Sequence, residues 1–520
     1  MLRSFGSSSS FSLCLAFSLT LLLPPTVARA QTLTRDQITA ALPALQAMAR
    51  RAVDAGGVPG LAIAVVYNDE TVYLEGFGLR EVGKPETVDA DTVFQLASLS
   101  KPVSSSAVAA LVSEGVVGWS SRIADLDPAF ALYDPYPAAQ VTVRDFFNHR
   151  SGLPGRGGDD LEDIGYGRDE VLHRLRLVPP SSSFRAGYSY SNFGFTEGAI
   201  AAAKPTGKSW EAVVEEKLFR PLGMTSSSAR YVDFLARPNR SALHVKVHGA
   251  WTAKLKRDPD AQGPAGGINS SVRDLAQWMR LELGNGMYDG KRLIDAAALD
   301  ETQAPLMARG NNPITGTATF YGLGWNVEFG RHGLSWGHAG AFSVGARTLV
   351  TIYPKSHLGI IVLSNAFPTG VPEGLADSFA DLLFAGKVEK DWVKAWDQIY
   401  DGLSGPAVAA AKAAYATPPA SATPALALAS YAARYTNAYV GDAVVANEHG
   451  TLTLTVGPGG ARTYAMRHFD RDLFLYFPDP ETPDKPSAVR FSIGADGKAS
   501  AMNVESLDTN GLGTLKRKHE

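Results

Sequence analysis

The sequence predicts an α+β protein in which an antiparallel sheet, covered by helices, stands beside a helical lobe and is followed by a small all-β domain. Three observations lead to this prediction. Strand-like runs lie near both ends of residues 31–395, helical patterns fill the middle of that segment, and alternating apolar runs dominate residues 429–520. We expect the strands from both ends to share one sheet, with a cleft where the sheet meets the lobe.

Residues 1–30 are typical of a secretory signal peptide. Arg3 precedes the apolar stretch 11–23, two prolines follow, and Ala28-Arg29-Ala30 resembles a cleavage site. The apolar stretch is too short to span a membrane, and no later stretch is long enough. Cys14 is the only cysteine, so the mature chain has no thiol for a disulfide or a metal. We expect a secreted or periplasmic protein with no stable membrane span.

Residues 31–395 are predicted to form one domain. Apolar residues at helical spacing predict a helix near residues 38–48 and another near residues 375–383. Between them, two pairs of apolar runs flank short polar turns and predict two hairpins. The expected hairpins join residues 61–67 to 71–77 and residues 346–353 to 358–363.

The end of the chain changes in composition. Residues 396–428 are rich in Ala, Pro and Ser, which predicts a linker that is helical only at residues 407–415. Residues 429–520 then contain the strictly alternating run 451–456 and several Gly, Pro and Asp turns, which predict a small β domain. Nothing in this domain resembles a catalytic constellation.

Charge and composition favour a small substrate as the partner. The chain carries 49 Lys and Arg against 52 Asp and Glu, for a formal charge of −3, and has no long basic run. Nucleic acid is therefore excluded as an expected partner, and a small molecule or peptide is the better expectation. The oligomeric state stays open.

Ser98 and Lys101 form the first chemical motif. Ser98-Leu99-Ser100-Lys101 opens a predicted helix that ends near Gly115, so both side chains lie on one face, a single turn apart. A serine hydroxyl needs a neighbouring base to become a nucleophile, and a lysine buried among apolar residues can lose its charge and serve as that base. Alone, this pattern also fits a helix cap followed by a solvated lysine.

Two further motifs supply candidate residues for proton transfer and for substrate binding. Tyr190 and Asn192 lie in a polar loop, where a phenol could move the serine proton and an amide could hold a substrate carbonyl. His338-Ala339-Gly340 begins a strand-like run that we expect to continue to residue 353, and Gly340 would let a substrate backbone approach the strand edge.

Together the three motifs resemble the class C β-lactamase and penicillin-recognising serine hydrolase family, which includes D-alanyl carboxypeptidases, D-amino-acid peptidases and esterases. Flanking stretches such as Asn148-His-Arg-Ser-Gly-Leu-Pro and Tyr321-Gly-Leu-Gly-Trp are also similar, and the likeness covers roughly residues 35–390. The β domain resembles the lipocalin-like domain that some members carry.

The resemblance implies an acyl-enzyme hydrolase without metal or organic cofactor, acting on D-amino-acid peptides, small esters or β-lactams. Ser98 would be the nucleophile, with Lys101 and Tyr190 as its base and acid. The implied substrate-binding residues are Asn192, His338, Gly340 and Ala341. The backbone N–H groups of Ser98 and Ala341 would form the oxyanion hole. The alternative is a catalytically silent, penicillin-binding-type receptor or scaffold that kept the fold.

His338 departs from the family pattern, because β-lactamases of this group usually have lysine there. A neutral imidazole holds a carboxylate less well than ammonium does, so we expect peptides or esters to be preferred over β-lactams. If the ring faces the acyl pocket, its protonated form would favour substrates with a free carboxylate. In the alternative, it stays neutral and hydrogen-bonds to the strand or to Tyr190.

Three other patterns are interpreted as structural. Ser335 lies in a G-x-S-x-G sequence, but a nucleophile elbow needs a helix after it, and here a strand-like run follows. Residues 202–209 nearly spell a phosphate loop but follow a helix-like run. His149 has no second ligand at helical spacing. Because every expected site residue precedes residue 345, we also expect the β domain to be unnecessary for the chemistry.

Overall fold

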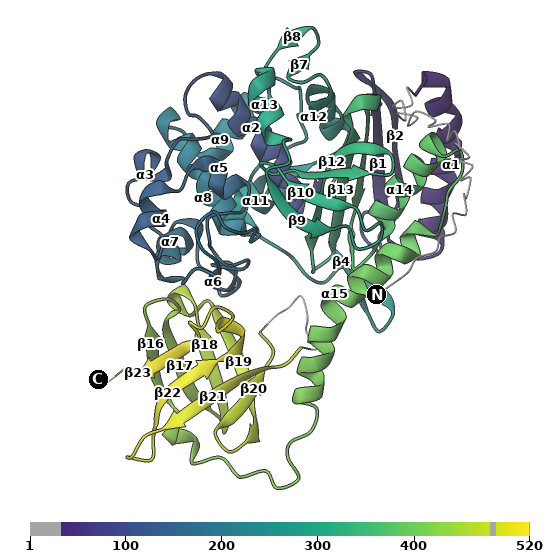
Figure 1. The fold of residues 1–520 in the computed structure, drawn as a ribbon. Coiled ribbons are helices and arrows are strands. Elements are labelled where there is room, and N and C mark those ends of the chain that lie inside the picture. The colour runs from purple at the N-terminus through teal and green to yellow at the C-terminus, as the bar shows by residue number, and fades with distance from the viewer. Residues whose placement is uncertain (1–32, 479–484, 519–520) are drawn as a thin grey trace, which may run out of the picture.

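The computed structural model describes residues 33–478 and 485–518, so the predicted signal peptide lies outside the described residues. An eight-stranded antiparallel sheet with helices on both faces stands beside a helical lobe, and a closed eight-stranded barrel follows (Figure 1). This arrangement confirms the predicted fold class.

The large sheet joins the two ends of the first segment. Its strand order is β2-β1-β14-β13-β12-β11-β10-β9. The strands are β1 (Gly60–Tyr67), β2 (Glu70–Gly78), β9 (Met307–Asn311), β10 (Ala318–Tyr321), β11 (Asn326–Gly330), β12 (Gly333–Phe342), β13 (Ala346–Tyr353) and β14 (Leu358–Ser364). Strands β1 and β14 pair in antiparallel register with Ile63 opposite Val362. Both predicted hairpins are confirmed.

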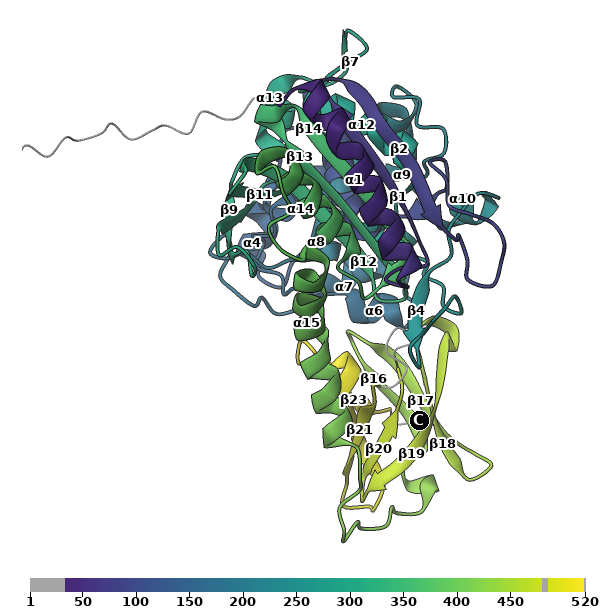
Figure 2. The same ribbon diagram turned by 90° about the vertical axis from the view of Figure 1, so that its right-hand side faces the viewer.

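Strand β1 separates two hydrophobic cores. Ile63 and Val65 face the core under α1 (Arg35–Asp54) and α14 (Val371–Phe384), the two helices that cover one face of the sheet (Figure 2). Their neighbours Ala64 and Val66 face the other core, under α12 (Val272–Leu283). Because alternate residues of a strand point to opposite faces, burial on both sides explains the unbroken apolar run of β1.

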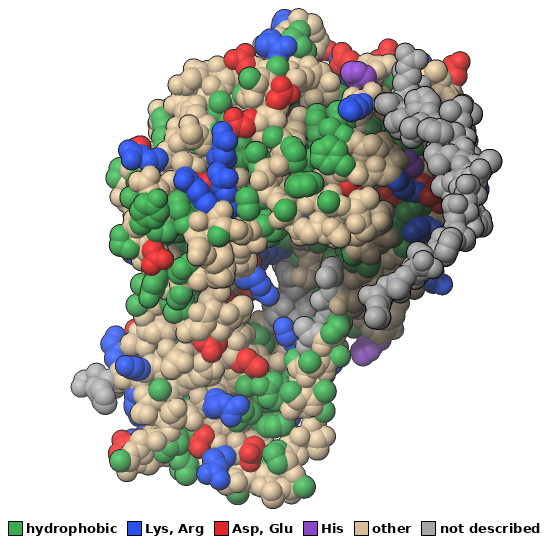
Figure 3. Space-filling view, in the orientation of Figure 1, with side chains coloured by type: hydrophobic (Ala, Val, Ile, Leu, Met, Phe, Trp, Pro, Cys, Tyr) green, Lys and Arg blue, Asp and Glu red, His purple; other side chains and the backbone are tan. Residues whose placement is uncertain are grey.

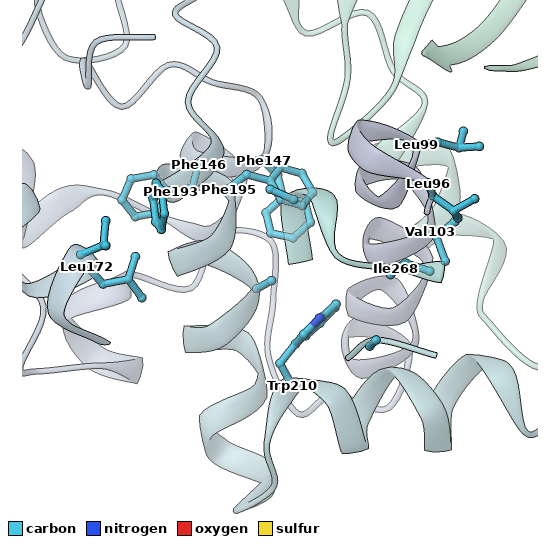
Figure 4. Packing of buried hydrophobic residues seen from close by; sticks show 14 of the residues in the cluster. Leu96, Leu99, Val103, Phe146, Phe147, Leu172, Phe193, Phe195, Trp210 and Ile268 are labelled. Carbon is cyan, nitrogen blue, oxygen red and sulfur yellow. The ribbon is translucent and has the colours of Figure 1, made fainter. Parts of the chain in front are cut away.

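The helical lobe is built around α2 (Ser100–Ser113). Its side chains are buried from Ser100 to Leu111, so the helix passes through the core between lobe and sheet. Aromatic residues from α5 (Val143–Phe147) and α8 (Asn192–Ala203) fill the lobe beside it (Figure 4). Phe147 and Phe195 lie with ring centroids 4.1 Å apart.

Two predicted elements differ from those observed. The run expected to continue from His338 to residue 353 is two strands, β12 and β13, because Gly345 (φ 127°) turns the chain between them. The helix expected at residues 407–415 is α15 (Trp392–Ala414), which starts fifteen residues earlier. Asp391 caps its N-terminus, and the helix packs against α14, so tertiary contact extends it into the predicted linker.

The barrel closes the chain. Its strands are β16 (Ala433–Asn437), β17 (Gly441–Glu448), β18 (Thr451–Val456), β19 (Arg462–Asp470), β20 (Leu473–Tyr476), β21 (Ser487–Ile493), β22 (Ala499–Val504) and β23 (Thr514–Arg517). Strand β23 pairs with β16 and closes the barrel.

Positive and negative side chains are interspersed over the face seen in Figure 3. No helix of residues 33–478 and 485–518 has the length and apolar character to cross a membrane.

A buried carboxyl group fixes α2 in the core. Glu282 of α12 accepts hydrogen bonds from Ser106 Oγ (2.5 Å) and Gln303 Nε2 (2.7 Å), and Trp278 Nε1 donates to the same Ser106 hydroxyl (2.8 Å). Burial raises the pKa of Glu282 from 4.5 to about 7, although these hydrogen bonds oppose the shift. The folded state therefore favours the protonated carboxyl.

We predict that Glu282→Gln stabilises the protein more at pH 8 than at pH 5. Because the pKa of Glu282 is higher in the folded state, its favourable contribution to the free energy of unfolding is lost as pH rises from about 4.5 to about 7. A neutral amide avoids that loss, which is on the order of 3 kcal/mol. Urea unfolding at both pH values measures the difference, with the exposed Glu215→Gln as a control. An equal effect of Glu282→Gln on the free energy of unfolding at pH 5 and pH 8 would contradict the raised pKa of Glu282.

Candidate active site

Ser98 lies in a short 3₁₀ turn, η1 (Ala97–Leu99), and α2 begins two residues later than predicted, at Ser100. The preceding residue, Ala97, is buried and has a left-handed φ of 48°. Such a conformation is costly for alanine and persists only where the surroundings hold it. Here Leu96 N donates to Ile268 O (2.9 Å), and Thr348 Oγ1 donates to Leu96 O (2.7 Å). The turn is therefore fixed from two sides.

Lys101 lies one turn further on and is fully buried. Its Nζ donates to Ser98 Oγ (3.2 Å), Asn192 Oδ1 (2.8 Å) and Ala265 O (3.0 Å). Burial lowers the pKa of Lys101 to about 7, and the nearby Asp159 carboxylate opposes this shift. An amine with this pKa can accept a proton near neutral pH.

Tyr190 completes the contacts of the serine hydroxyl. Its Oη donates to Ser98 Oγ at 2.9 Å, and Lys101 Nζ lies 4.5 Å from the centre of its ring. Burial raises the pKa of Tyr190 far above its usual value, and the Ser98 hydrogen bond only partly offsets this effect. The phenol is therefore neutral in this state. The structure brings together the three residues that the sequence singled out.

Asn192 is the first residue of α8, and both ends of its amide are engaged. Its Oδ1 accepts from Lys101, while its Nδ2 donates to Asp159 Oδ2 at 3.4 Å. Burial raises the pKa of Asp159 to about 6. Sequence reasoning missed Asp159, because its only signal is an acidic pair after Gly157-Gly158, at the start of the short helix α6 (Asp159–Asp163), which is distant in sequence from Asn192.

His338 lies with its ring buried rather than open to solvent. Its Nε2 is 2.9 Å from Tyr321 Oη, and its Nδ1 is 2.7 Å from Ala339 O. Burial, followed by the charge of Lys101, lowers the pKa of His338 well below its usual value. The ring is therefore neutral at neutral pH, which matches the alternative of a neutral histidine, although its phenol partner is Tyr321 and not Tyr190. The imidazolium expected to attract carboxylates does not form under these conditions.

Gly340 has a different role from the one expected. A Cβ at this position would lie 2.2 Å from Leu96 O, 2.4 Å from Thr348 Oγ1 and 2.8 Å from Leu99 N. The glycine thus allows β12 to pack against the turn that carries Ser98, and the space expected for a substrate backbone is filled by that turn.

The strand edge beside this turn is open. Strand β12 pairs with β13 through Phe342, but its pairing with β11 ends at Gly337. Among the described strands, none pairs with residues 338–342 on the side of β11. Ala341 lies in this open stretch, next to Gly340 and the serine turn. An extended substrate could hydrogen-bond to such an edge.

The other patterns are structural, as interpreted. His149 follows α5 with φ 58°, its Nδ1 accepts from Ser191 N (3.1 Å), and its ring packs 4.4 Å from that of Tyr190. Ser335 lies inside β12, paired with Glu328, and the strand continues after it, so no helix follows. Residues 204–209 connect α8 to α9 (Trp210–Val214). The described ranges contain no group of three His, Cys, Asp or Glu residues arranged to hold a metal ion.

Comparison with known proteins identifies two families along the chain. The Beta-lactamase family matches residues 45–383, and a domain of unknown function, DUF3471, matches residues 417–513. Penicillin-binding protein 4 of Amycolatopsis lactamdurans is 28% identical over 350 residues, covering 63% of this chain and 84% of that protein. The D-alanyl-D-alanine-carboxypeptidase/endopeptidase AmpH of Escherichia coli (strain K12) is 25% identical over 338 residues, with the same coverage.

Two further matches extend the comparison. The unguisins hydrolase ungD' of Aspergillus campestris is 26% identical over 333 residues, covering 61% of this chain, which spans only 60% of that longer relative. The octameric penicillin-binding protein homologue from Pyrococcus abyssi aligns with a TM-score of 0.56 and 18% identity, over 89% of this chain and 98% of that one. This structure supports the fold of both parts of the chain.

We predict that Gly340→Ala slows reaction at Ser98 by about 10²-fold or more, because the added methyl group must displace the serine turn. The rate of Ser98 labelling by a fluorophosphonate measures the effect. Gly330→Ala is the matched control, since its Cβ would meet only the Glu328 side chain at 3.4 Å or beyond. A normal labelling rate in Gly340→Ala would show that the turn tolerates the methyl group.

Proposed function

Since the chain belongs to the Beta-lactamase family, we propose that it is a serine hydrolase that acts through an acyl-enzyme on Ser98. One observation carries the proposal. Ser98 Oγ lies within hydrogen-bond distance of both Lys101 Nζ and Tyr190 Oη, and Lys101 is buried with a pKa of about 7. This arrangement supplies a nucleophile, a base of matched pKa and a path for the proton.

In the proposed mechanism, Ser98 Oγ attacks the substrate carbonyl carbon while its proton passes to neutral Lys101. The carbonyl oxygen takes up negative charge and is held by the N–H groups of Ser98 and Ala341. Collapse of this intermediate breaks the amide or ester bond, and the proton moves from Lys101 through Tyr190 to the leaving group. Water then attacks the acyl-Ser98 ester by the reverse proton path, which releases the acid and restores the serine.

Lys101 is the principal base in this scheme. Tyr190 has a strongly raised pKa, so a phenolate is costly, whereas Lys101 exchanges its proton near neutral pH. Tyr190 then acts as a relay that passes one proton while it receives another. Asn192 is held by Lys101 at its Oδ1 and by Asp159 at its Nδ2, and its second N–H would orient the substrate.

The proposed substrates are small esters and D-amino-acid peptides, with β-lactams less favoured. Neutral His338 offers no positive charge to a substrate carboxylate, and this reduces the attraction for the β-lactam carboxylate. A hydrolysis panel of short acyl esters, D-amino-acid peptides and β-lactams distinguishes these classes. Faster turnover of β-lactams than of esters would overturn this order.

We also propose that the protein is secreted or periplasmic. Cleavage after Ala30 would leave Gln31 as the first residue. N-terminal sequencing of the protein recovered from the native host tests this proposal, and an intact Met1 would contradict it.

We predict that Lys101→Ala and Tyr190→Phe each slow acylation of Ser98 by about 10² to 10⁴, because each removes one proton-transfer partner. Binding of an unreactive substrate analogue should change little. The measurement is the rate of Ser98 adduct formation with a fluorophosphonate, followed by mass spectrometry.

The controls are Lys204→Ala, a partly exposed lysine that pairs with Asp127, and Tyr188→Phe, a tyrosine with no hydrogen bond to Ser98. Near-normal rates for both active-site variants would overturn the mechanism. Absence of any Ser98 adduct in the wild type, with fluorophosphonate and with penicillin, would favour the receptor or scaffold alternative.

A further inference from the structure

The barrel contacts the helical lobe at the segment that carries Asp159. This segment contains α6 (Asp159–Asp163), which lies at the end of the barrel near β16 and β18 (Figure 1). The contact on the barrel side is formed by the loop between β16 and β17, which contains Tyr439, and by the turn that follows β18. Two parts of the chain that are far apart in sequence therefore meet close to the serine site.

Tyr439 makes the central contact and is almost fully buried. Its hydroxyl donates to Asp160 Oδ1 at 2.5 Å and accepts from Gly158 N at 3.3 Å. These two groups flank Asp159 in the chain. One barrel hydroxyl thus holds the backbone on one side of Asp159 and the side chain on the other.

Other contacts keep the barrel seated on this segment. Tyr166 Oη donates to Val440 O at 2.9 Å, and Arg174 donates to Tyr439 O. Gly457 lies so close to the segment that a Cβ there would be 1.9 Å from Ile164 O. Its φ of 86° also favours glycine, so the barrel turn is shaped for this close approach.

From Asp159 the hydrogen bonds continue to the nucleophile. Asp159 Oδ2 accepts from Asn192 Nδ2, Asn192 Oδ1 accepts from Lys101 Nζ, and Lys101 Nζ donates to Ser98 Oγ. A continuous chain of contacts therefore links the barrel hydroxyl to the serine through a lobe carboxylate, an amide and an amine.

We propose that Tyr439 and Asp159 are positioning residues of the serine site, so that the barrel sets the proton affinity of Lys101 by holding the Asp159 carboxylate against Asn192. This inference rests on the proposed function. It also revises the expectation that the β domain is unnecessary for the chemistry, since the barrel supplies a contact one residue from Asp159 on each side.

The charged groups around Asp159 and Lys101 determine whether loss of the Asp159 carboxylate raises or lowers the pKa of Lys101. Asp159 faces Arg156, Asp163, Lys101 and Arg257. Lys101 is also close to the rings of His149, His338 and Tyr190, which are neutral in this state, so Asp159 is the charge that raises its pKa. Without a fixed Asp159 charge, burial lowers the pKa of Lys101 further, and the base stays neutral down to lower pH.

The test measures the rate of Ser98 labelling by an uncharged fluorophosphonate between pH 5 and pH 9 in the full chain. We expect the acid limb of the wild-type profile to shift to lower pH in Asp159→Asn, by about half a pH unit or more. Tyr439→Phe should give a smaller shift in the same direction, because the ring still packs while the hydroxyl contacts are lost. A merely structural role would change the amplitude of the profile and leave its midpoint in place.

Controls and a double variant complete the design. Tyr435→Phe is the matched control, since its hydroxyl donates to Tyr431 O inside the barrel and does not reach α6. If Tyr439 acts through Asp159, the double variant that combines Tyr439→Phe with Asp159→Asn shifts the acid limb no further than Asp159→Asn alone. Tyr166→Phe removes a second barrel contact and should shift the limb as Tyr439→Phe does, which keeps the test available if Tyr439→Phe does not fold.

Two outcomes would overturn the inference. In one, Tyr439→Phe and Tyr166→Phe keep the wild-type midpoint, as Tyr435→Phe does. In the other, the shifts of Tyr439→Phe and Asp159→Asn add in the double variant. Failure of the proposed function is distinct, because the wild type would then show no Ser98 adduct at any pH.

Discussion

The burial of the Lys101 amine beside Ser98 is the constraint on which the rest of the site depends. A fully buried ammonium group is costly, and it persists only where hydrogen bonds and an opposite charge offset the loss of water. Lys101 has three hydrogen-bond acceptors and one nearby carboxylate, Asp159. This partial compensation leaves the amine close to its neutral form, which is the state that a general base requires.

Several distant segments must meet to build this environment. Helix α2 supplies Lys101, the start of α8 supplies Asn192, and residue Ala265 supplies a carbonyl from a third segment. The sheet fixes the turn that carries Ser98, because Gly340 allows β12 to lie against this turn at Leu96 and Leu99. A strand without a side chain at this point is therefore part of the geometry that places Ser98 next to its base.

The sequence predicted the parts of the fold and site that depend on local spacing. The hairpins follow from alternating apolar runs, and Ser98 and Lys101 share a helix face because they are three residues apart. Contacts between distant segments were missed, because they do not depend on local spacing. Asp159 is distinguished by its position beside Asn192, and α15 is extended by packing on α14, and neither contact leaves a periodic pattern in the sequence.

The same low-dielectric surroundings explain why, of the two side chains that hydrogen-bond to Ser98, Lys101 titrates close to neutral pH and Tyr190 does not. Burial lowers the pKa of both Lys101 and His338, and the nearby charge of Lys101 lowers that of His338 as well. Tyr190 is held neutral by burial as well. With these rings neutral, the Asp159 carboxylate is the charge that shifts the pKa of Lys101 against burial. At His338 a substrate entering this site would meet a neutral hydrogen-bonding ring in place of a cation, and this weakens recognition of a free carboxylate at that position.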